Sequence, residues 1–378
     1  MAEIHGTYED RFAAVADAFS ASIDSGADVG GSVAVMHDGN LVVDIWGGWA
    51  DEAKTAPWER DTITNVWSTT KTMTFLVSLL LADRGELDFD APVARYWPEF
   101  AANGKDGVLV RHLLGHTAGL SGWQEPMTEA DFEDWDLCTS RLAAQAPWWE
   151  PGTASGYHAI TQGYLIGEVV RRITGQSFGT FFAKEIAGPL GADFHIGLDP
   201  VHFGRVSNVI PPPPLEIPEG LDLDSVIIRT FGNPPMRAEV SHTDGWRRAE
   251  VPAANGHGNA RSVAMAQAVI SHGGEFNGTR FVSSRTLERI FEVQALGVDM
   301  VLGVPARIGM GYGISGPEFP LGPNPRTCFW GGWGGSIAVN DLDSRTTTAF
   351  MMNKMGAGTV GDERAGAILM GVYAGLAS

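Results

Sequence analysis

Apolar residues follow two periods along the chain, and each period predicts a different kind of element. A spacing of three and four residues, typical of one helix face, predicts helices over residues 9–23, 163–174, 260–272 and 362–377. Alternating or continuous apolar runs bounded by turn residues predict strands over residues 31–37, 41–46, 336–340 and 346–352. The predicted strands therefore lie near both ends of the chain.

The middle of the chain, residues 88–257, is dominated by helical pattern and loops. Because strands flank it on both sides, we expect an α+β fold. In this fold an antiparallel sheet built from both termini is flanked by helices and carries an inserted, mostly helical lobe. The expected domains are a discontinuous sheet domain, residues 1–87 plus 258–378, and the inserted domain, residues 88–257. The seam between them is the expected place for a small-molecule site.

One predicted helix carries candidate chemistry at its start. The run over residues 72–82 is apolar on almost every side, as in a helix buried all round, with Gly85 as its stop. Ser68 and Lys71 precede it, and Lys71 alone among the five lysines has a serine three residues upstream. Residues three apart share a helix face, so the Lys71 amine can reach the Ser68 hydroxyl. Such a pair can supply the base that a serine nucleophile needs.

The first turn of a helix also favours this chemistry. The backbone N–H of Ser68 lacks an intrahelical partner there and is free to bind a developing oxyanion. The positive end of the helix dipole and burial both disfavour the protonated amine, so we expect a lowered pKa for Lys71.

Composition limits the partners. The 378 residues are 44% hydrophobic and carry a formal net charge of −19, which argues against nucleic acid or an anionic membrane surface. The two cysteines, Cys138 and Cys328, are too few for a disulfide framework and favour a reducing compartment. No secretory signal or membrane span is visible, so the prediction is a soluble cytoplasmic protein. The oligomeric state stays open.

Three motifs occur in order: Ser68-Thr69-Thr70-Lys71, then Tyr157 about ninety residues later, then Trp330-Gly331-Gly332. Framework segments at residues 112–120 and 149–153 accompany them. Together they make nearly the whole chain resemble the serine β-lactamase and penicillin-binding-protein superfamily, in particular the class C-like branch and the family VIII carboxylesterases. The resemblance implies a serine hydrolase that cleaves small carboxylic esters through an acyl-enzyme, with no cofactor and no metal.

The resemblance also implies residue roles. Ser68 matches the acylated nucleophile, Lys71 matches the lysine that helps to deprotonate it, and Tyr157 matches the general base. An unperturbed tyrosine titrates near 10, so Tyr157 must either work beside a Lys71 cation or relay its proton to neutral Lys71. The Trp330–Gly332 segment matches the substrate-binding Lys-Thr-Gly edge strand. By register, the backbone N–H of Trp333 is then the second oxyanion donor, opposite that of Ser68.

Two departures from the β-lactamase pattern favour esters. Ala159 replaces the asparagine of the Tyr-x-Asn motif, and Trp330 replaces the lysine that would pair with a β-lactam carboxylate. A neutral ester loses nothing when that cation is absent. His158, next to Tyr157, is a candidate substrate contact, and a structural role for it is equally open.

Alternatives remain. β-Lactamase activity or acyl transfer would use the same site, and a non-catalytic scaffold of the same fold would lack one of the three site residues. Ser177 stands in a Gly-x-Ser-x-Gly motif, the nucleophile elbow of α/β-hydrolases, but it follows a predicted helix rather than a strand. We therefore predict that Ser177 caps the next helix. His112 and His116 have a metal-like spacing but no third ligand.

Overall fold

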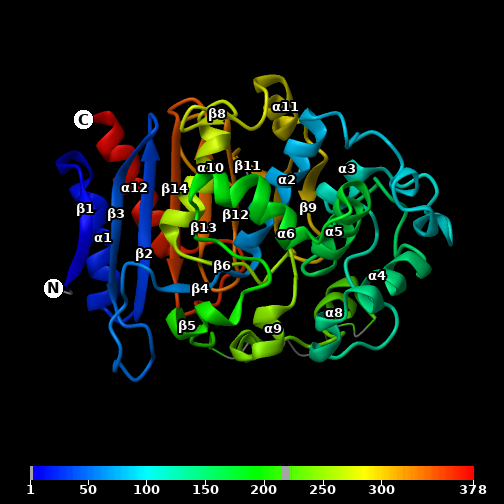
Figure 1. Ribbon diagram of the computed structural model, residues 1–378, viewed down its shortest axis with the longest axis horizontal. Helices are drawn as coiled ribbons and strands as arrows, with labels where there is room; N and C mark the ends of the chain where they lie inside the picture. The colour runs from blue at the N-terminus through cyan, green and yellow to red at the C-terminus, as the bar shows by residue number, and fades with distance from the viewer. Residues whose placement is uncertain (1–2, 214–221, 223, 318) are drawn as a thin grey trace.

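A computed structural model describes residues 3–213, 222, 224–317 and 319–378. Its main feature is a nine-stranded sheet with the order β1-β3-β2-β14-β13-β12-β11-β10-β9 and antiparallel pairing throughout (Figure 1). The strands come from both ends of the chain: β1 (Ile4–Tyr8), β2 (Gly30–His37), β3 (Asn40–Gly48), β9 (Ala295–Val298), β10 (Pro305–Ile308), β11 (Gly313–Ile314), β12 (Thr327–Gly331), β13 (Ile337–Asp341) and β14 (Thr346–Met352). The predicted antiparallel sheet built from both termini is confirmed.

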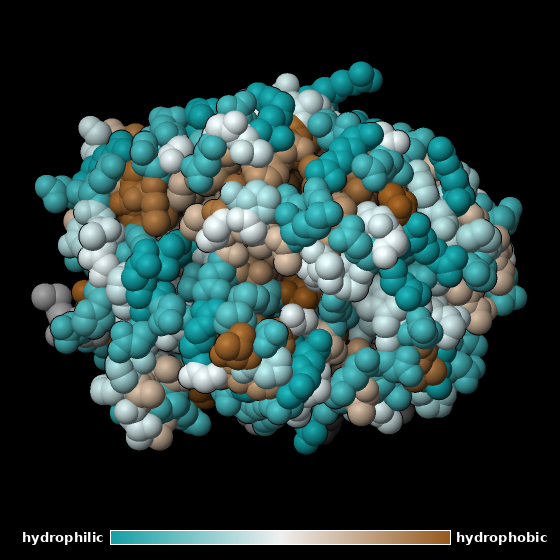
Figure 2. All heavy atoms as spheres, in the orientation of Figure 1, coloured by the Kyte–Doolittle hydropathy of each residue, from teal (hydrophilic) through white to brown (hydrophobic). Residues whose placement is uncertain are grey.

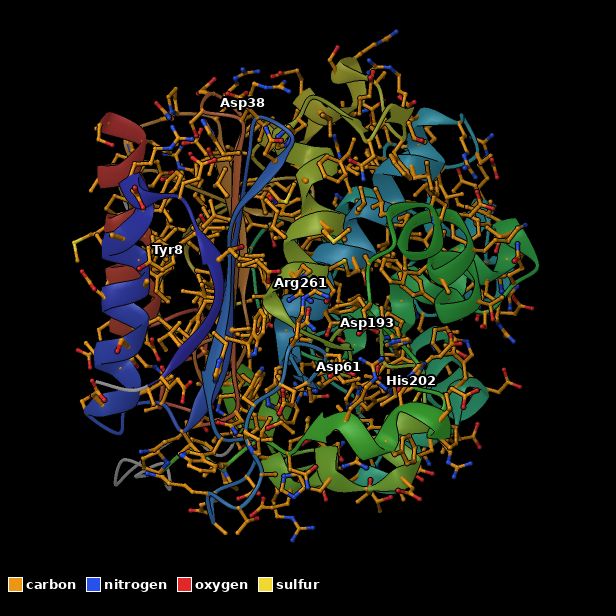
Figure 3. All side chains as sticks on the ribbon, turned by 60° about the vertical axis from the view of Figure 1, so that its left-hand side comes forward. Tyr8, Asp38, Asp61, Asp193, His202 and Arg261 are labelled. Atoms are coloured by element: carbon orange, nitrogen blue, oxygen red, sulfur yellow. The ribbon has the colours of Figure 1, made fainter. Side chains whose placement is uncertain are left out.

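Helices cover both faces of this sheet. On one face α1 (Ala13–Asp24) packs along α12 (Glu363–Ala377), and on the other α10 (Ala260–Ser271) contacts β14, β2 and β13. Figure 3 shows the blue and red helices on one side of the strands and the yellow-green α10 on the other. All three helices match the predicted ranges within a few residues, because their apolar stripes face the sheet.

The helix after Ser68 begins differently from the prediction. The α-helix α2 covers Lys71–Asp83, and a 3₁₀ turn, Trp67–Thr70, precedes it, so Ser68 lies in the turn. In a 3₁₀ turn residues i and i+3 eclipse one another, which brings Ser68 and Lys71 together as directly as an α-helix would. Every residue from Lys71 to Leu81 is buried, and Gly85 follows the helix at φ +72°. The predicted stop is confirmed.

The middle of the chain is mostly helical. It contains α3 (Val110–Leu114), α4 (Trp135–Ala144), α5 (Thr161–Thr174), α6 (Phe178–Phe182), α7 (Gly188–Leu190), α8 (Val226–Phe231) and α9 (Asp244–Arg248). A small sheet joins it to the rest, made of β4 (Ile63–Asn65), β5 (Val206–Ser207) and β6 (His257–Gly258). Between α10 and β9 the chain forms a hairpin of β7 (Glu275–Phe276) and β8 (Thr279–Arg280), followed by α11 (Ser284–Glu288). The domain division at residues 87/88 and 257/258 stays a prediction.

Strands β1, β9, β10 and β11 were not predicted from the sequence. They are short, and both edge strands expose most of their residues, so no alternation of buried and exposed positions marks them. Figure 2 shows apolar side chains gathered in separate patches on one largely polar face. Over the described ranges, none of the helices has the length and apolar character that crossing a bilayer requires.

Candidate active site

Three side chains that are distant in sequence converge on one oxygen atom. The Tyr157 hydroxyl lies 2.6 Å from Ser68 Oγ and donates to it, and Lys71 Nζ lies 3.2 Å from the same oxygen. Ser68 comes from the 3₁₀ turn, Lys71 from the first turn of α2, and Tyr157 from the irregular segment before α5. The structure thus brings together the three residues that the motifs selected.

Lys71 is held in place by backbone carbonyls. Its side chain is fully buried, and Nζ donates to Ala159 O at 2.6 Å and to Ala253 O at 3.0 Å. Burial disfavours the charged amine and lowers the pKa of Lys71 well below its ordinary value. In the neutral amine the two N–H groups point at these carbonyls, so the lone pair of Nζ faces Ser68 Oγ. Sequence reasoning missed both carbonyls, since backbone oxygens leave no residue signature.

The pKa of Tyr157 changes in the opposite direction. Burial raises its pKa to about 12, although the hydrogen bond with Ser68 works against this. A neutral amine and a protonated phenol are therefore the favoured forms of the pair. Lys71 Nζ also lies 4.8 Å from the centre of the Tyr157 ring.

The two backbone donors expected to bind an oxyanion, the N–H groups of Ser68 and Trp333, have no backbone acceptor among the described residues. Gly332, just before Trp333, comes very close to the residue that precedes the 3₁₀ turn of Ser68: a Cβ on Gly332 would lie 2.3 Å from Ser336 Oγ and 2.4 Å from Val66 O. Only glycine permits that approach. The oxyanion role of both N–H groups stays a prediction.

The strand that carries Trp330 is internal in the order of the sheet, but from Trp330 onward it pairs with β13 alone, so the segment expected to form an edge does so. Strand β12 pairs with β13 along its length, but β11 pairs with it only as far as Phe329, so it is an edge only beyond that residue. The Trp330 side chain is only 4% exposed and lies with its ring centre 5.8 Å from that of Tyr157. Its indole therefore packs behind the tyrosine, and substrate contacts of Gly331 and Gly332 stay predictions.

His158 is placed for structure rather than for substrate. Its ring is fully buried, Nδ1 lies 2.6 Å from Gly156 O, and Nε2 accepts the Leu120 N–H at 3.1 Å. Burial lowers its pKa to about 3, so the ring is neutral. We correct its assignment as a substrate contact: both nitrogens already hold backbone groups. The ring of His116 likewise accepts the His158 N–H, and the described residues hold no group of three or more His, Cys, Asp or Glu suited to a metal ion.

The Gly-x-Ser-x-Gly motif has a structural explanation for each of its three fixed positions. Gly175 ends α5 at φ +69°, and Ser177 caps α6 by accepting the Thr180 N–H. A Cβ on Gly179 would lie 2.0 Å from a backbone oxygen, so that position requires close approach. The Ser177 hydroxyl donates to Glu250 at 2.6 Å. A helix precedes this serine, which confirms the predicted cap.

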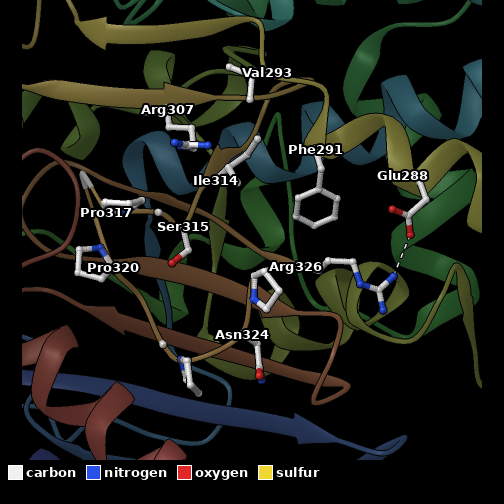
Figure 4. A pocket seen from close by; sticks show the side chains of 14 residues that line it. Glu288, Phe291, Val293, Arg307, Ile314, Ser315, Pro317, Pro320, Asn324 and Arg326 are labelled. Carbon is white, nitrogen blue, oxygen red and sulfur yellow. Dashed lines mark hydrogen bonds and ion pairs between the residues drawn. The ribbon is translucent and has the colours of Figure 1, made fainter.

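Two other features, a pocket and a cluster of charged side chains, lie apart from Ser68. A pocket of about 550 Å³ opens beside the end of β10, among Phe291, Val293, Arg307 and a proline-rich loop, and contains none of the three convergent residues (Figure 4). Figure 3 shows Asp193 and His202 near one another to the right of the main sheet, toward the green helices. The Arg205 guanidinium contacts both of them, which makes this cluster unfavourable for a cation.

Known proteins resemble this chain over almost its full length. The family model described as Beta-lactamase matches residues 15–371. The esterase/beta-lactamase LipL of Mycobacterium tuberculosis (strain ATCC 25618 / H37Rv) is 35% identical over 98% of this chain and 87% of its own. The crystal structure of a family VIII carboxylesterase superposes with a TM-score of 0.93 at 39% identity, over 99% of this chain and 100% of that one. A penicillin-binding-protein homologue from Caulobacter crescentus gives a TM-score of 0.92 at 36% identity, over 99% and 100%.

Proposed function

Since the chain belongs to the beta-lactamase family, we propose that this serine hydrolase cleaves small, neutral carboxylic esters through an acyl-enzyme on Ser68. The observation that carries the proposal is the convergence of Tyr157 OH and Lys71 Nζ on Ser68 Oγ, at 2.6 and 3.2 Å. A nucleophile, a neutral amine able to take its proton and a phenol able to give one are thus within one hydrogen bond of each other.

In the acylation step we assign the base to Lys71 rather than to Tyr157, because the neutral amine and the protonated phenol are the favoured forms. The Ser68 hydroxyl gives its proton to the neutral Nζ, and Oγ attacks the ester carbonyl carbon. The carbonyl oxygen becomes an oxyanion that the N–H groups of Ser68 and Trp333 bind. The tetrahedral intermediate then expels the alkoxide, which takes the Tyr157 proton, and Tyr157 regains a proton from the Lys71 ammonium. The alcohol leaves, and the acyl group stays on Ser68.

Deacylation runs through the same groups. A water molecule attacks the acyl carbonyl while its proton passes to Lys71, directly or through Tyr157. The second tetrahedral intermediate collapses by breaking the bond to Ser68 Oγ, which takes a proton back. The carboxylic acid leaves and the resting forms of all three groups return.

The residues around the site favour neutral substrates. Trp330 stands where β-lactamases of this pattern carry a lysine, and its apolar ring lies against Tyr157. Ala159 has no side-chain amide, and its carbonyl is already bound to Lys71. A substrate carboxylate would therefore lack the cation that anchors it in β-lactamases. One similar structure is that of a family VIII carboxylesterase, which agrees with this preference, while the LipL relative is named for both activities.

Acyl transfer to an alcohol and weak β-lactam hydrolysis would also proceed through an acyl group on Ser68. Activity assays with the corresponding substrates distinguish these alternatives from ester hydrolysis. The non-catalytic alternative requires the loss of a site residue, whereas Ser68, Lys71 and Tyr157 all converge. The cytoplasm stays the predicted compartment.

The test compares short-chain p-nitrophenyl esters with a chromogenic β-lactam, using wild type, Ser68→Ala and Ser177→Ala. The proposal expects ester hydrolysis by wild type and Ser177→Ala, none by Ser68→Ala, and a kcat/KM for the β-lactam at least about tenfold lower. Ester hydrolysis that survives in Ser68→Ala would overturn the proposal.

A further inference from the structure

The segment that carries Tyr157 has no regular structure to hold it. Residues 154–158 form neither helix nor strand, so the tyrosine depends on contacts with neighbouring elements. The Gly156 and His158 N–H groups bind His116, within the same part of the chain. The Tyr157 N–H instead binds Asp299 Oδ1 at 3.0 Å, across 142 residues of sequence. Within the part of the chain that the structure describes, the tip of the β9–β10 hairpin thus supplies the acceptor for this N–H.

We propose that Asp299 is a positioning residue, which fixes Tyr157 against Ser68 from the hairpin between β9 and β10. This inference rests on the ester hydrolase proposed above and adds a residue that neither the motifs nor the family resemblance selected. Asp299 touches no reacting atom and acts through the backbone of Tyr157.

The carboxylate is oriented before it meets Tyr157. Asp299 is fully buried, and its Oδ1 also accepts the N–H groups of Val301 and Leu302, each at 2.9 Å. The hairpin closes on itself through Asp299 N–H to Val304 O at 3.1 Å and Gly303 N–H to Asp299 O at 2.8 Å. A carboxylate held by its own turn is a preorganised acceptor, because little rotamer freedom remains to be lost.

A second hydrogen bond ties the same two segments together. The Met300 N–H donates to Ser155 O at 2.9 Å, two residues before Tyr157. Residues 155 and 157 are therefore both attached to residues 299 and 300, which fixes the direction of this short stretch as well as its position. The attachment joins the sheet, through β9 and β10, to the segment that leads into α5.

The geometry at Ser68 makes this attachment consequential. Tyr157 is 5% exposed, so its N–H would lose a partner in a buried place without the carboxylate. The working contact is the 2.6 Å hydrogen bond between Tyr157 OH and Ser68 Oγ. A misplacement of about 1 Å at a reacting group costs about 10²-fold in rate. We therefore expect about a 10²-fold loss of kcat when Asp299 is removed.

The test uses Asp299→Ala, Asp299→Asn and a matched control, Asp341→Ala. Asp341 is also a buried carboxylate at a hairpin turn, where its Oδ1 accepts the N–H groups of Asp343 and Ser344, each at 3.0 Å, but it does not contact the Tyr157 segment. For each purified full-length variant we would measure Tm, and kcat and KM for a short p-nitrophenyl ester.

The inference expects Asp299→Ala to lose about 10²-fold in kcat, with KM changed by no more than about threefold. Asp299→Asn keeps an acceptor oxygen and should recover kcat to within about tenfold of wild type. Asp341→Ala should lower Tm and leave kcat unchanged. Equal kcat in Asp299→Ala and Asp341→Ala at similar Tm would overturn the inference. If Asp299→Ala does not fold, the result for Asp299→Asn decides. A folded Asp299→Asn protein whose kcat is lowered about 10²-fold would overturn the inference, because the acceptor oxygen is still present. Inactive wild type would count against the proposed function itself.

Discussion

Replacing Tyr157 with phenylalanine removes one oxygen and tests whether the phenol moves a proton. The lost group is the hydroxyl that lies 2.6 Å from Ser68 Oγ, while the ring contacts with Trp330 and Lys71 remain. Proton transfer by a positioned side chain contributes about 10²- to 10⁴-fold. The expected loss in kcat is of that size, or about 2.7 to 5.4 kcal/mol in the barrier at 1.36 kcal/mol per tenfold.

The assay is steady-state hydrolysis of a short p-nitrophenyl ester, with Tyr164→Phe as a matched control. Tyr164 is also fully buried and donates through its hydroxyl, to Phe132 O at 2.5 Å, but does not contact Ser68. Tyr164→Phe should lose about 1 to 3 kcal/mol of unfolding free energy, because it removes the donor to the buried Phe132 carbonyl, whereas in Tyr157→Phe the Ser68 hydroxyl keeps its contact with Lys71 Nζ. Only Tyr157→Phe should lose kcat. A Tyr157→Phe enzyme with more than a tenth of wild-type kcat would refute the proton-transfer role.

Three further outcomes follow from the geometry. The pKa of Lys71 is lowered by burial and the neutral amine is the base, so kcat should be lost as pH falls through that lowered pKa. No alkaline fall is expected until pH approaches the Tyr157 pKa of about 12, and a pH–rate profile with an alkaline limb near neutrality would contradict this. Ser177→Ala should lower the free energy of unfolding, measured with denaturant, by about 1 kcal/mol and leave kcat unchanged, because Ser177 is a helix cap. Phe19→Ala should lower the free energy of unfolding by about 3 to 5 kcal/mol and leave kcat unchanged at low temperature, since Phe19 is fully buried on α1 with its ring centre 6.4 Å from that of Phe350 in the sheet. A loss below about 1 kcal/mol would be inconsistent with that packing.

Periodicity predicted the elements whose faces differ in burial. Helices α1, α10 and α12 and the strands β2, β3, β13 and β14 fall where apolar spacing placed them. The edge strands β1 and β9 were missed, because mostly exposed residues at a sheet edge carry no apolar alternation. The partner of β1, strand β3, is also distant in sequence, so no local turn signal marks that pairing.

Some residues of the candidate site could be predicted from the sequence, and others could not. Ser68, Lys71 and Tyr157 were predicted because side chains of these types form a recognisable motif. The carbonyls of Ala159 and Ala253 that hold Lys71, and the carboxylate of Asp299 that holds Tyr157, depend on long-range packing and were missed. His158 was misassigned because sequence position next to Tyr157 does not reveal that its ring points into the backbone around Leu120.

The most direct measurement of the central claim is the intact mass of the protein after brief exposure to a fluorophosphonate, followed by peptide mapping. The predicted result is one adduct on the Ser68 peptide, absent in Ser68→Ala and retained in Ser177→Ala. An adduct on Ser177 instead would contradict the assignment of Ser68 as the nucleophile.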